Sequence, residues 1–201
     1  MSWIRIVPPS QAEGRLGEMY RQVAGPSGEV DNILQVHSLR PHSLAGHLAL
    51  YKAVLHHNRN TLGRATLELL GVFVSNWNGC DYCREHHFAG LARHLRDNAQ
   101  SESIRATLER DSWETDFAPR ERELLRYALK LTRDPGALTE QDMTGMREVG
   151  LTDGEILEAN QVVAYFQYAI RTVTGLGVSH VDEPLGLAPS NVDDETDWSH
   201  R

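Results

Sequence analysis

Hydrophobic residues recur at three- and four-residue steps along most of the chain, which is the spacing expected of helices that bury one face. The clearest stretch covers residues 62–77, where Leu62, Ala65, Leu69 and Phe73 fall on one side of a helix. The sequence has no convincing alternation of polar and apolar residues, which would indicate a β-strand. The pattern therefore predicts an all-α fold.

Capping residues and helix breakers divide this pattern into separate elements. The last predicted helix is apolar on nearly every side, so we expect it to be the central helix of the core or part of a subunit interface. The predicted helices cover residues 10–24, 33–36, 44–55, 62–77, about 80–98, a shorter one that opens at Ser101, 119–133, 139–149 and 152–173, with Ser10, Asp31, Thr139 and Thr152 as caps.

The length of 201 residues suits one domain with a sizeable core. Helical periodicity ends before residue 180, so residues 1–180 are predicted to form the all-α domain. Residues 181–201 contain six acidic residues and one arginine, and they carry −5 of the net charge of −8. We expect this acidic C-terminal segment to be mobile or loosely docked.

Charge and hydropathy argue against several classes of protein. A weakly acidic body is unsuited to nucleic acid or an anionic membrane as the main partner. The sequence has no run of 18 apolar residues, so no membrane span is expected. Pro8 and Pro9 stand where a signal peptide needs its apolar centre. We therefore expect a cytoplasmic protein.

The chain has only two cysteines, Cys80 and Cys83, and two placed at random would fall three apart roughly one time in a hundred. In a reducing compartment, such a pair is more often redox-active or metal-binding than a permanent disulfide. On a helix that starts near Cys80, Cys83 and His87 share its face. The helix N-terminus favours a thiolate at Cys80, and the imidazole can reach Cys83 and take its proton. This is a complete dithiol unit, in which one thiolate attacks, the other closes a disulfide and a base assists.

Glu68 lies on the preceding predicted helix, on an apolar flank where an unpaired carboxylate is costly. One interpretation is that Glu68 orients His87 or passes protons to a cysteine through water. The alternative is an ion pair with Arg64, one turn earlier on the same helix. The sequence leaves both open.

Three alternatives to redox chemistry compete for the cysteine pair. The Cys-x2-Cys-x3-His pattern supplies three of the four ligands that zinc prefers, with His86, Asp81 or Glu68 as candidates for the fourth. Haem attachment needs a His directly after the second cysteine, where Arg84 stands. The pair could also be inert buried thiols. Local sequence favours redox chemistry, with zinc as its main rival.

The other side chains near the pair give weaker signals. His86 projects about 100° away from His87 on a helix and is expected to face solvent or a partner helix. Tyr82 could border the pocket, and Trp77 is expected in the core. Five further histidines form no ligand pattern and are expected to be structural: His37, His42, His47, His56 and His57.

Glu68, Cys80 twelve residues later, Cys83 and His87 together resemble the signature of the alkylhydroperoxidase D and carboxymuconolactone decarboxylase superfamily. The Cys-x-Tyr-Cys form is similar to the peroxidase-related branch. This resemblance implies an all-α, multi-helix alkylhydroperoxidase D-like bundle that forms a homo-oligomer, with the dithiol helix near a subunit contact. The likeness to that branch extends over residues 31–56, 119–135 and 148–178, and so over most of residues 1–180.

The resemblance also implies hydroperoxide reduction without a metal or flavin cofactor. Cys83 would be the attacking cysteine that passes through sulfenic acid, and Cys80 the more exposed resolving cysteine and proton donor. His87 and Glu68 would form the proton relay. The founding alkylhydroperoxidase D proteins have His between the cysteines, where this chain has Tyr82, and this departure bears on the rate and the reductant.

The sequence therefore predicts a cytoplasmic thiol peroxidase with an antioxidant role. An external dithiol, from a lipoyl or thioredoxin-like protein, would regenerate the pair. Two other classes stay open. One is a decarboxylase of the carboxymuconolactone type, whose reaction needs no thiols. The other is a noncatalytic metal-binding or redox-sensing module.

Overall fold

Helices joined by turns and loops make up most of residues 2–189, the part that the computed structural model describes. No β-strand occurs among these residues, which confirms the predicted all-α fold. A π-helical turn over Lys52–His56 extends α3, and 3₁₀ turns cover Pro9–Gln11 and Pro135–Ala137. In chain order, the α-helices are α1 (Gly14–Val23), α2 (Asn32–Gln35), α3 (Pro41–Tyr51), α4 (Arg64–Trp77), α5 (Asp81–Leu95), α6 (Asn98–Glu109), α7 (Trp113–Asp116), α8 (Pro119–Arg133), α9 (Glu140–Glu148) and α10 (Asp153–Gly175).

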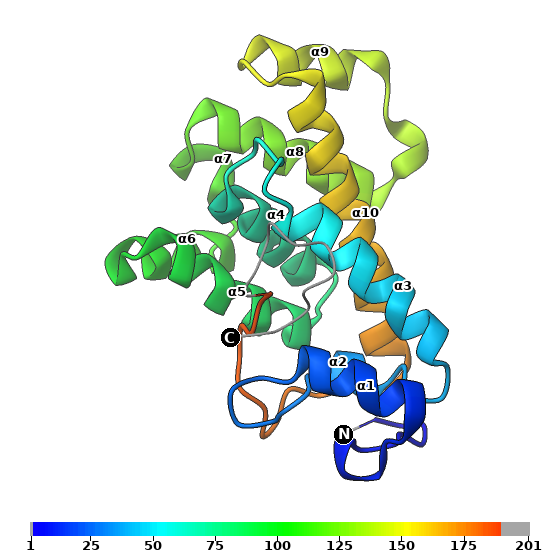
Figure 1. Ribbon diagram of the computed structural model, residues 1–201. Coiled ribbons are helices and arrows are strands. Elements are labelled where there is room, and N and C mark those ends of the chain that lie inside the picture. Colours follow the sequence, from blue (N-terminus) through cyan, green and yellow to red (C-terminus); the bar gives the residue numbers. More distant parts are fainter. Residues whose placement is uncertain (1, 190–201) are drawn as a thin grey trace.

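Helices α4, α5 and α10 form the centre of the domain (Figure 1). α4 and α5 are joined by a short turn and pack extensively against each other, while α10 contacts both of them. α8 packs against α4 and α10. The turn between α4 and α5 contains Gly79, whose φ of +64° lies in the left-handed region that favours glycine. This hairpin places the start of α5, and with it the cysteine pair, against the core.

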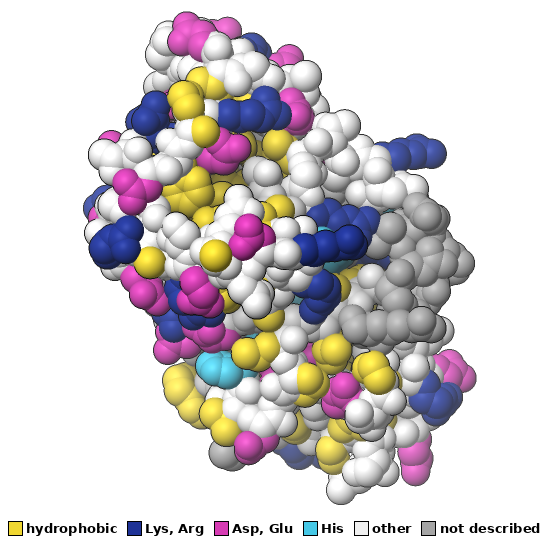
Figure 2. All heavy atoms as spheres, turned by 90° about the vertical axis from the view of Figure 1, so that its left-hand side faces the viewer, with side chains coloured by type: hydrophobic (Ala, Val, Ile, Leu, Met, Phe, Trp, Pro, Cys, Tyr) yellow, Lys and Arg dark blue, Asp and Glu magenta, His cyan; other side chains and the backbone are white. Residues whose placement is uncertain are grey.

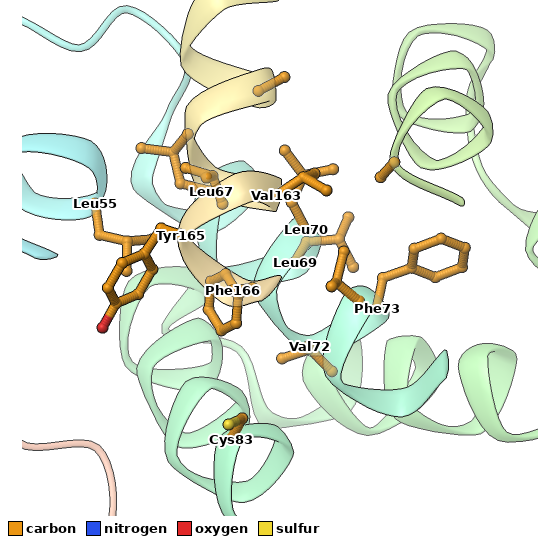
Figure 3. Close-up of a cluster of buried hydrophobic side chains, with 14 of the residues drawn as sticks. Leu55, Leu67, Leu69, Leu70, Val72, Phe73, Cys83, Val163, Tyr165 and Phe166 are labelled. Atoms are coloured by element: carbon orange, nitrogen blue, oxygen red, sulfur yellow. The ribbon is translucent and has the colours of Figure 1, made fainter. Parts of the chain in front are cut away.

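The contact between α4 and α10 depends on a glycine. The ring of Phe166 lies against Gly71, where an added Cβ atom would stand 2.2 Å from the ring. Val162, Val163 and Phe166 are fully buried, so α10 is the central helix of the core, one of the two roles expected for it. Figure 3 shows the side chains of α10 facing those of α4, with Cys83 of α5 in the same cluster. Helix α5, which carries the cysteine pair, therefore packs as part of the core.

A second, smaller cluster joins α1 to α2 and α3. It buries apolar residues at helical spacing in α1, α2 and α3, as the periodicity predicted, together with Val30 before α2. Its members are Leu16, Met19, Tyr20, Val23, Val30, Leu34, Leu44 and Leu48.

Several local predictions were wrong, and one helix was not predicted. Ser10 lies in the turn Pro9–Gln11, and α1 begins only at Gly14. α6 begins before Ser101 because the Asp97 side chain accepts a hydrogen bond from the Gln100 amide at 3.0 Å and caps the helix. Trp77, expected in the core, is 39% exposed because it is the last residue of α4. α7 was not predicted, since four residues are too few to show a period.

The segment after α10 returns along the outside of α2 and α5. Glu183 accepts a hydrogen bond from the Asn32 amide at 2.8 Å, and Gly186 lies against Ala89 of α5. The first part of the acidic segment is thus docked on the domain, while residues 190–201 of it lie outside the described residues. On the face shown in Figure 2, acidic and basic side chains are interspersed, with hydrophobic ones visible between them. No helix within residues 2–189 is both long and apolar enough to cross a membrane.

Candidate active site

Cys80 and Cys83 lie at the first turn of α5, as predicted. Cys80 is the N-terminal cap of the helix, and its sulfur accepts a hydrogen bond from the Cys83 amide at 3.3 Å. The two sulfur atoms are 2.7 Å apart, and both thiols are free. Each residue is only 3% exposed, so the greater exposure expected of Cys80 is not found. The pair is ready to close a disulfide but is well shielded from solvent.

Hydrogen bonding separates the pKa values of the two thiols. The hydrogen bond with Cys83 lowers the pKa of Cys80 below its usual value, although burial opposes it. That same hydrogen bond, together with burial, raises the pKa of Cys83 well above its usual value. The first negative charge of the reduced pair therefore lies on Cys80, while Cys83 holds the remaining proton.

Glu68 of α4 is buried and pairs with His87 of α5. Its Oε2 atom lies 2.7 Å from His87 Nδ1. Burial would raise the pKa of Glu68, but the charge and hydrogen bond of His87 lower it below its ordinary value. Arg64 instead donates a hydrogen bond to the His56 carbonyl at 3.2 Å, so the alternative ion pair between Glu68 and Arg64 is wrong. The carboxylate fixes the imidazole and leaves Nε2 for proton transfer.

Two neighbours hold this pair in place. A Cβ atom at position 90 would lie 2.9 Å from the Glu68 carboxyl group, so Gly90 lets the carboxylate approach the backbone of α5. The ring of Phe166 meets the His87 ring edge-on, with 4.5 Å between centroids. The core contact between α4 and α10 therefore also orients the imidazole.

A cavity of about 50 Å³ opens beside these groups. Cys83, Glu68 and His87 border it, whereas Cys80 does not. Among the described residues, His87 makes no hydrogen bond to either sulfur, contrary to the direct contact that its spacing allowed. A proton moving between His87 and Cys83 must therefore pass through a water molecule or the substrate in the cavity. Further residues on the cavity wall include Asp31, His47, Tyr51, Tyr82, Tyr165 and residues 186–188.

His86 lies at the site, although the sequence did not predict it there. It is buried, and its Nε2 atom lies 2.6 Å from Oε1 of Glu183. Its ring stacks on Tyr82, with 4.5 Å between centroids, and both residues border the cavity. The prediction that His86 faces solvent or a partner helix was wrong, because the segment after α10 covers that side of α5. Tyr82 borders the cavity as predicted.

His47, expected to be structural, also borders the cavity. Burial lowers the pKa of His47 to about 3, so its imidazole is neutral. Spacing along α3 gave no signal for it, because its neighbours in the cavity come from other helices. Within residues 2–189, no group of three or more His, Cys, Asp and Glu side chains is arranged to hold a metal ion.

No protein-family model and no curated protein matches this chain. Several solved structures are similar to it. The alkylhydroperoxidase AhpD core of an uncharacterized peroxidase-related protein from Ralstonia eutropha JMP134 aligns with a TM-score of 0.78 and 22% identity, over 90% of this chain and 93% of that chain. An uncharacterized peroxidase-related protein from Silicibacter sp. TM1040 aligns with a TM-score of 0.75 and 22% identity, over 89% and 91% of the two chains.

A third similar structure is that of a debrominase. The debrominase Bmp8, in complex with 2,3,4-tribromopyrrole, aligns with a TM-score of 0.62 and 16% identity, over 87% of this chain and 91% of that chain. Together these likenesses confirm the alkylhydroperoxidase D-like fold that the signature of Glu68, Cys80, Cys83 and His87 predicted.

Proposed function

We propose that this chain, which has the alkylhydroperoxidase D-like fold, is a thiol-dependent peroxidase that reduces hydroperoxides through a dithiol–disulfide cycle. The observation that carries the proposal is the position of Cys83 on the wall of a cavity that it shares with the paired Glu68 and His87. The sulfur atom of a second thiol, Cys80, lies 2.7 Å from the sulfur atom of Cys83. A nucleophile, a resolving thiol and an acid–base pair thus meet at one small site.

In the first step, Cys83 attacks the peroxide. Its proton passes to the Cys80 thiolate, which moves the negative charge to the sulfur that borders the cavity. The S–O bond forms as the O–O bond breaks, so Cys83 becomes a sulfenic acid. The leaving oxygen takes a proton from the His87 imidazolium, which Glu68 stabilises, and departs as an alcohol or as water.

In the second step, Cys80 resolves the sulfenic acid. Its sulfur attacks the sulfur of Cys83, the S–O bond breaks, and the proton of Cys80 leaves with the hydroxyl group as water. An external dithiol then reduces the disulfide by exchange and becomes a disulfide itself. That step returns the pair to one thiol and one thiolate, and the released proton recharges His87.

The burial of both sulfur atoms favours one kind of reductant over another. Because each cysteine is only 3% exposed, a dithiol on a slender arm, as in a lipoyl protein, reaches the pair more readily than the surface of a folded thioredoxin-like protein. We propose that this exchange takes place in the cytoplasm. We also propose that the chain acts there as a homo-oligomer with the dithiol helix near a subunit contact.

Two other activities can be distinguished from the peroxidase by experiment. Activity that survives alkylation of both thiols would favour a decarboxylase of the carboxymuconolactone type. The similar fold of a debrominase bound to a halogenated pyrrole makes reductive dehalogenation a second candidate. Halide release from a bromopyrrole, without consumption of hydroperoxide, would favour that activity.

Replacement of Cys80 should stop the cycle after the first step. In Cys80→Ser, one equivalent of an organic hydroperoxide should add one oxygen atom to Cys83, because no thiol remains to close the disulfide. We expect this product by peptide mass analysis, with the wild-type protein giving a Cys80–Cys83 disulfide under the same conditions. A Cys83 that gains no oxygen in Cys80→Ser, together with a reactive Cys80 in Cys83→Ser, would reverse the two roles.

A further inference from the structure

Asp31 stands at the capping position of α2 but does not cap it. The amides of Asn32 and Ile33 donate instead to Glu183 at 2.8 Å and to the Tyr82 hydroxyl at 3.1 Å. An Asp at this position ordinarily accepts a hydrogen bond from the amide of the second or third helical residue, here Ile33 or Leu34. Its carboxyl group borders the cavity, and its buried Oδ1 atom has no hydrogen-bond partner among the described residues. Burial raises the pKa of this carboxyl to about 7, which shows how poorly its charge is compensated.

His47 is a second polar side chain with a buried, unpaired atom, and it borders the same cavity. It is 3% exposed, and its Nδ1 atom has no hydrogen bond within the described part of the chain. Its ring lies among those of Tyr51 and Tyr165, with centroids 6.4 and 5.8 Å away. A neutral imidazole has one nitrogen that donates and one that accepts. Buried groups left unpaired cost free energy, so both Asp31 and His47 favour a ligand that bonds to them.

The cavity wall also restricts the charge of a ligand. Asp31 and Glu68 border the cavity, and no Lys or Arg does so within residues 2–189. The His87 imidazolium of the proposed cycle is already paired with Glu68, so a bound carboxylate or phosphate would face the acidic Asp31 without a free cation. The volume of about 50 Å³ is well below the roughly 150 Å³ of an apolar cavity that holds benzene. The wall therefore suits a small molecule without negative charge.

We infer that Asp31 and His47 form a recognition subsite for a hydroxyl or N–H group of the substrate. This inference rests on the proposed peroxidase function, and it deepens that function by naming a substrate class. That class is a small, uncharged hydroperoxide with a hydrogen-bond donor remote from its O–O bond. The donor bonds to the Asp31 carboxyl group, and the oxygen of a hydroxyl can also accept from the N–H of His47. Tyr51 and Tyr165 contact the apolar part, and the peroxide group reaches Cys83. Long anionic hydroperoxides do not fit this wall.

Two hydroperoxides of equal size test the subsite. 2-Hydroxyethyl hydroperoxide and n-propyl hydroperoxide differ only in a hydroxyl in place of a methyl group. We expect wild-type kcat/KM to be about tenfold higher for the hydroxyl compound, the factor that one ordinary hydrogen bond provides. Asp31→Leu should bring the ratio close to one, because it removes the carboxyl group that accepts the hydrogen bond of the hydroxyl. Asp153→Asn, at the exposed start of α10, is the control and should keep the wild-type ratio.

His47→Phe keeps an aromatic ring but removes both ring nitrogens, and it tests the same subsite if Asp31→Leu does not fold. We expect it to lower the ratio as well. A ratio near one in the wild-type protein, or a raised ratio that neither variant changes, would overturn the subsite and leave the peroxidase intact. Failure of the wild-type protein to consume either hydroperoxide would instead overturn the proposed function.

Discussion

Cys83→Ser should abolish peroxide consumption. A serine hydroxyl at this position cannot form the sulfenic acid, and no other sulfur borders the cavity within the described residues. We expect the steady-state rate with an organic hydroperoxide and a small dithiol to fall by at least about a thousandfold, the scale of loss when a nucleophile is removed. The measurement is peroxide loss over time, corrected for the direct reaction of the dithiol with the peroxide.

Cys80→Ser is the matched control for this experiment, because it makes the same atomic change three residues away. It should also lose multiple turnover. Its first equivalent of peroxide should still react, more slowly than in the wild type because no Cys80 thiolate takes the proton of Cys83, whereas Cys83→Ser should consume none. Thermal unfolding of both variants checks that the buried serine has not unfolded the protein. Full activity in a folded Cys83→Ser variant would contradict the mechanism.

His87→Gln should produce the second largest effect. Glutamine keeps a polar group near Glu68 but cannot carry the proton that the leaving oxygen needs. General acid–base groups contribute about 10² to 10⁴ in rate, so we expect kcat/KM to fall by roughly a hundredfold or more. The loss should be largest for alkyl hydroperoxides with poorly acidic leaving alcohols, since these depend most on the proton donor. The rate of sulfenic acid formation, followed in single-turnover experiments, is the direct readout.

Glu68→Gln tests whether the two residues act as a unit. The carboxylate lies 2.7 Å from the imidazole, so its removal should lower the rate in the same direction as His87→Gln. The double variant should be little worse than His87→Gln alone, because groups that act together are not additive. His42→Gln, at the exposed start of α3, should leave the rate unchanged. Additive losses from Glu68 and His87 would show that they act separately.

The sequence predicted best what is encoded locally. Thr152 forms a capping box with Glu155, Pro119 opens α8, and Cys80 caps α5, so these helices begin close to the predicted residues. The dithiol and His87 lie within eight consecutive residues of one helix, so their spacing alone placed them together. Helical periodicity was sufficient for these features because each depends on residues only three or four positions apart.

The rest of the site depends on tertiary packing. Asp31 matches the pattern of a helix cap, but Glu183 and Tyr82 take its place at the amides of α2 and release its carboxyl group to the cavity. Glu183, 152 residues later in the chain, also covers His86. His47 and residues 186–188 reach the cavity from α3 and from the segment after α10. No local spacing relates these residues to the cysteines, so the sequence could not identify the cavity wall.

The most direct test of the proposed dithiol–disulfide cycle is a thiol titration of the purified wild-type protein before and after one equivalent of an organic hydroperoxide. Zinc should be assayed in the same sample. The proposed cycle predicts two free thiols before treatment and none afterwards, an intramolecular Cys80–Cys83 disulfide by mass, and no zinc. Thiols that stay free after the peroxide is added, or stoichiometric zinc bound to the pair, would contradict it.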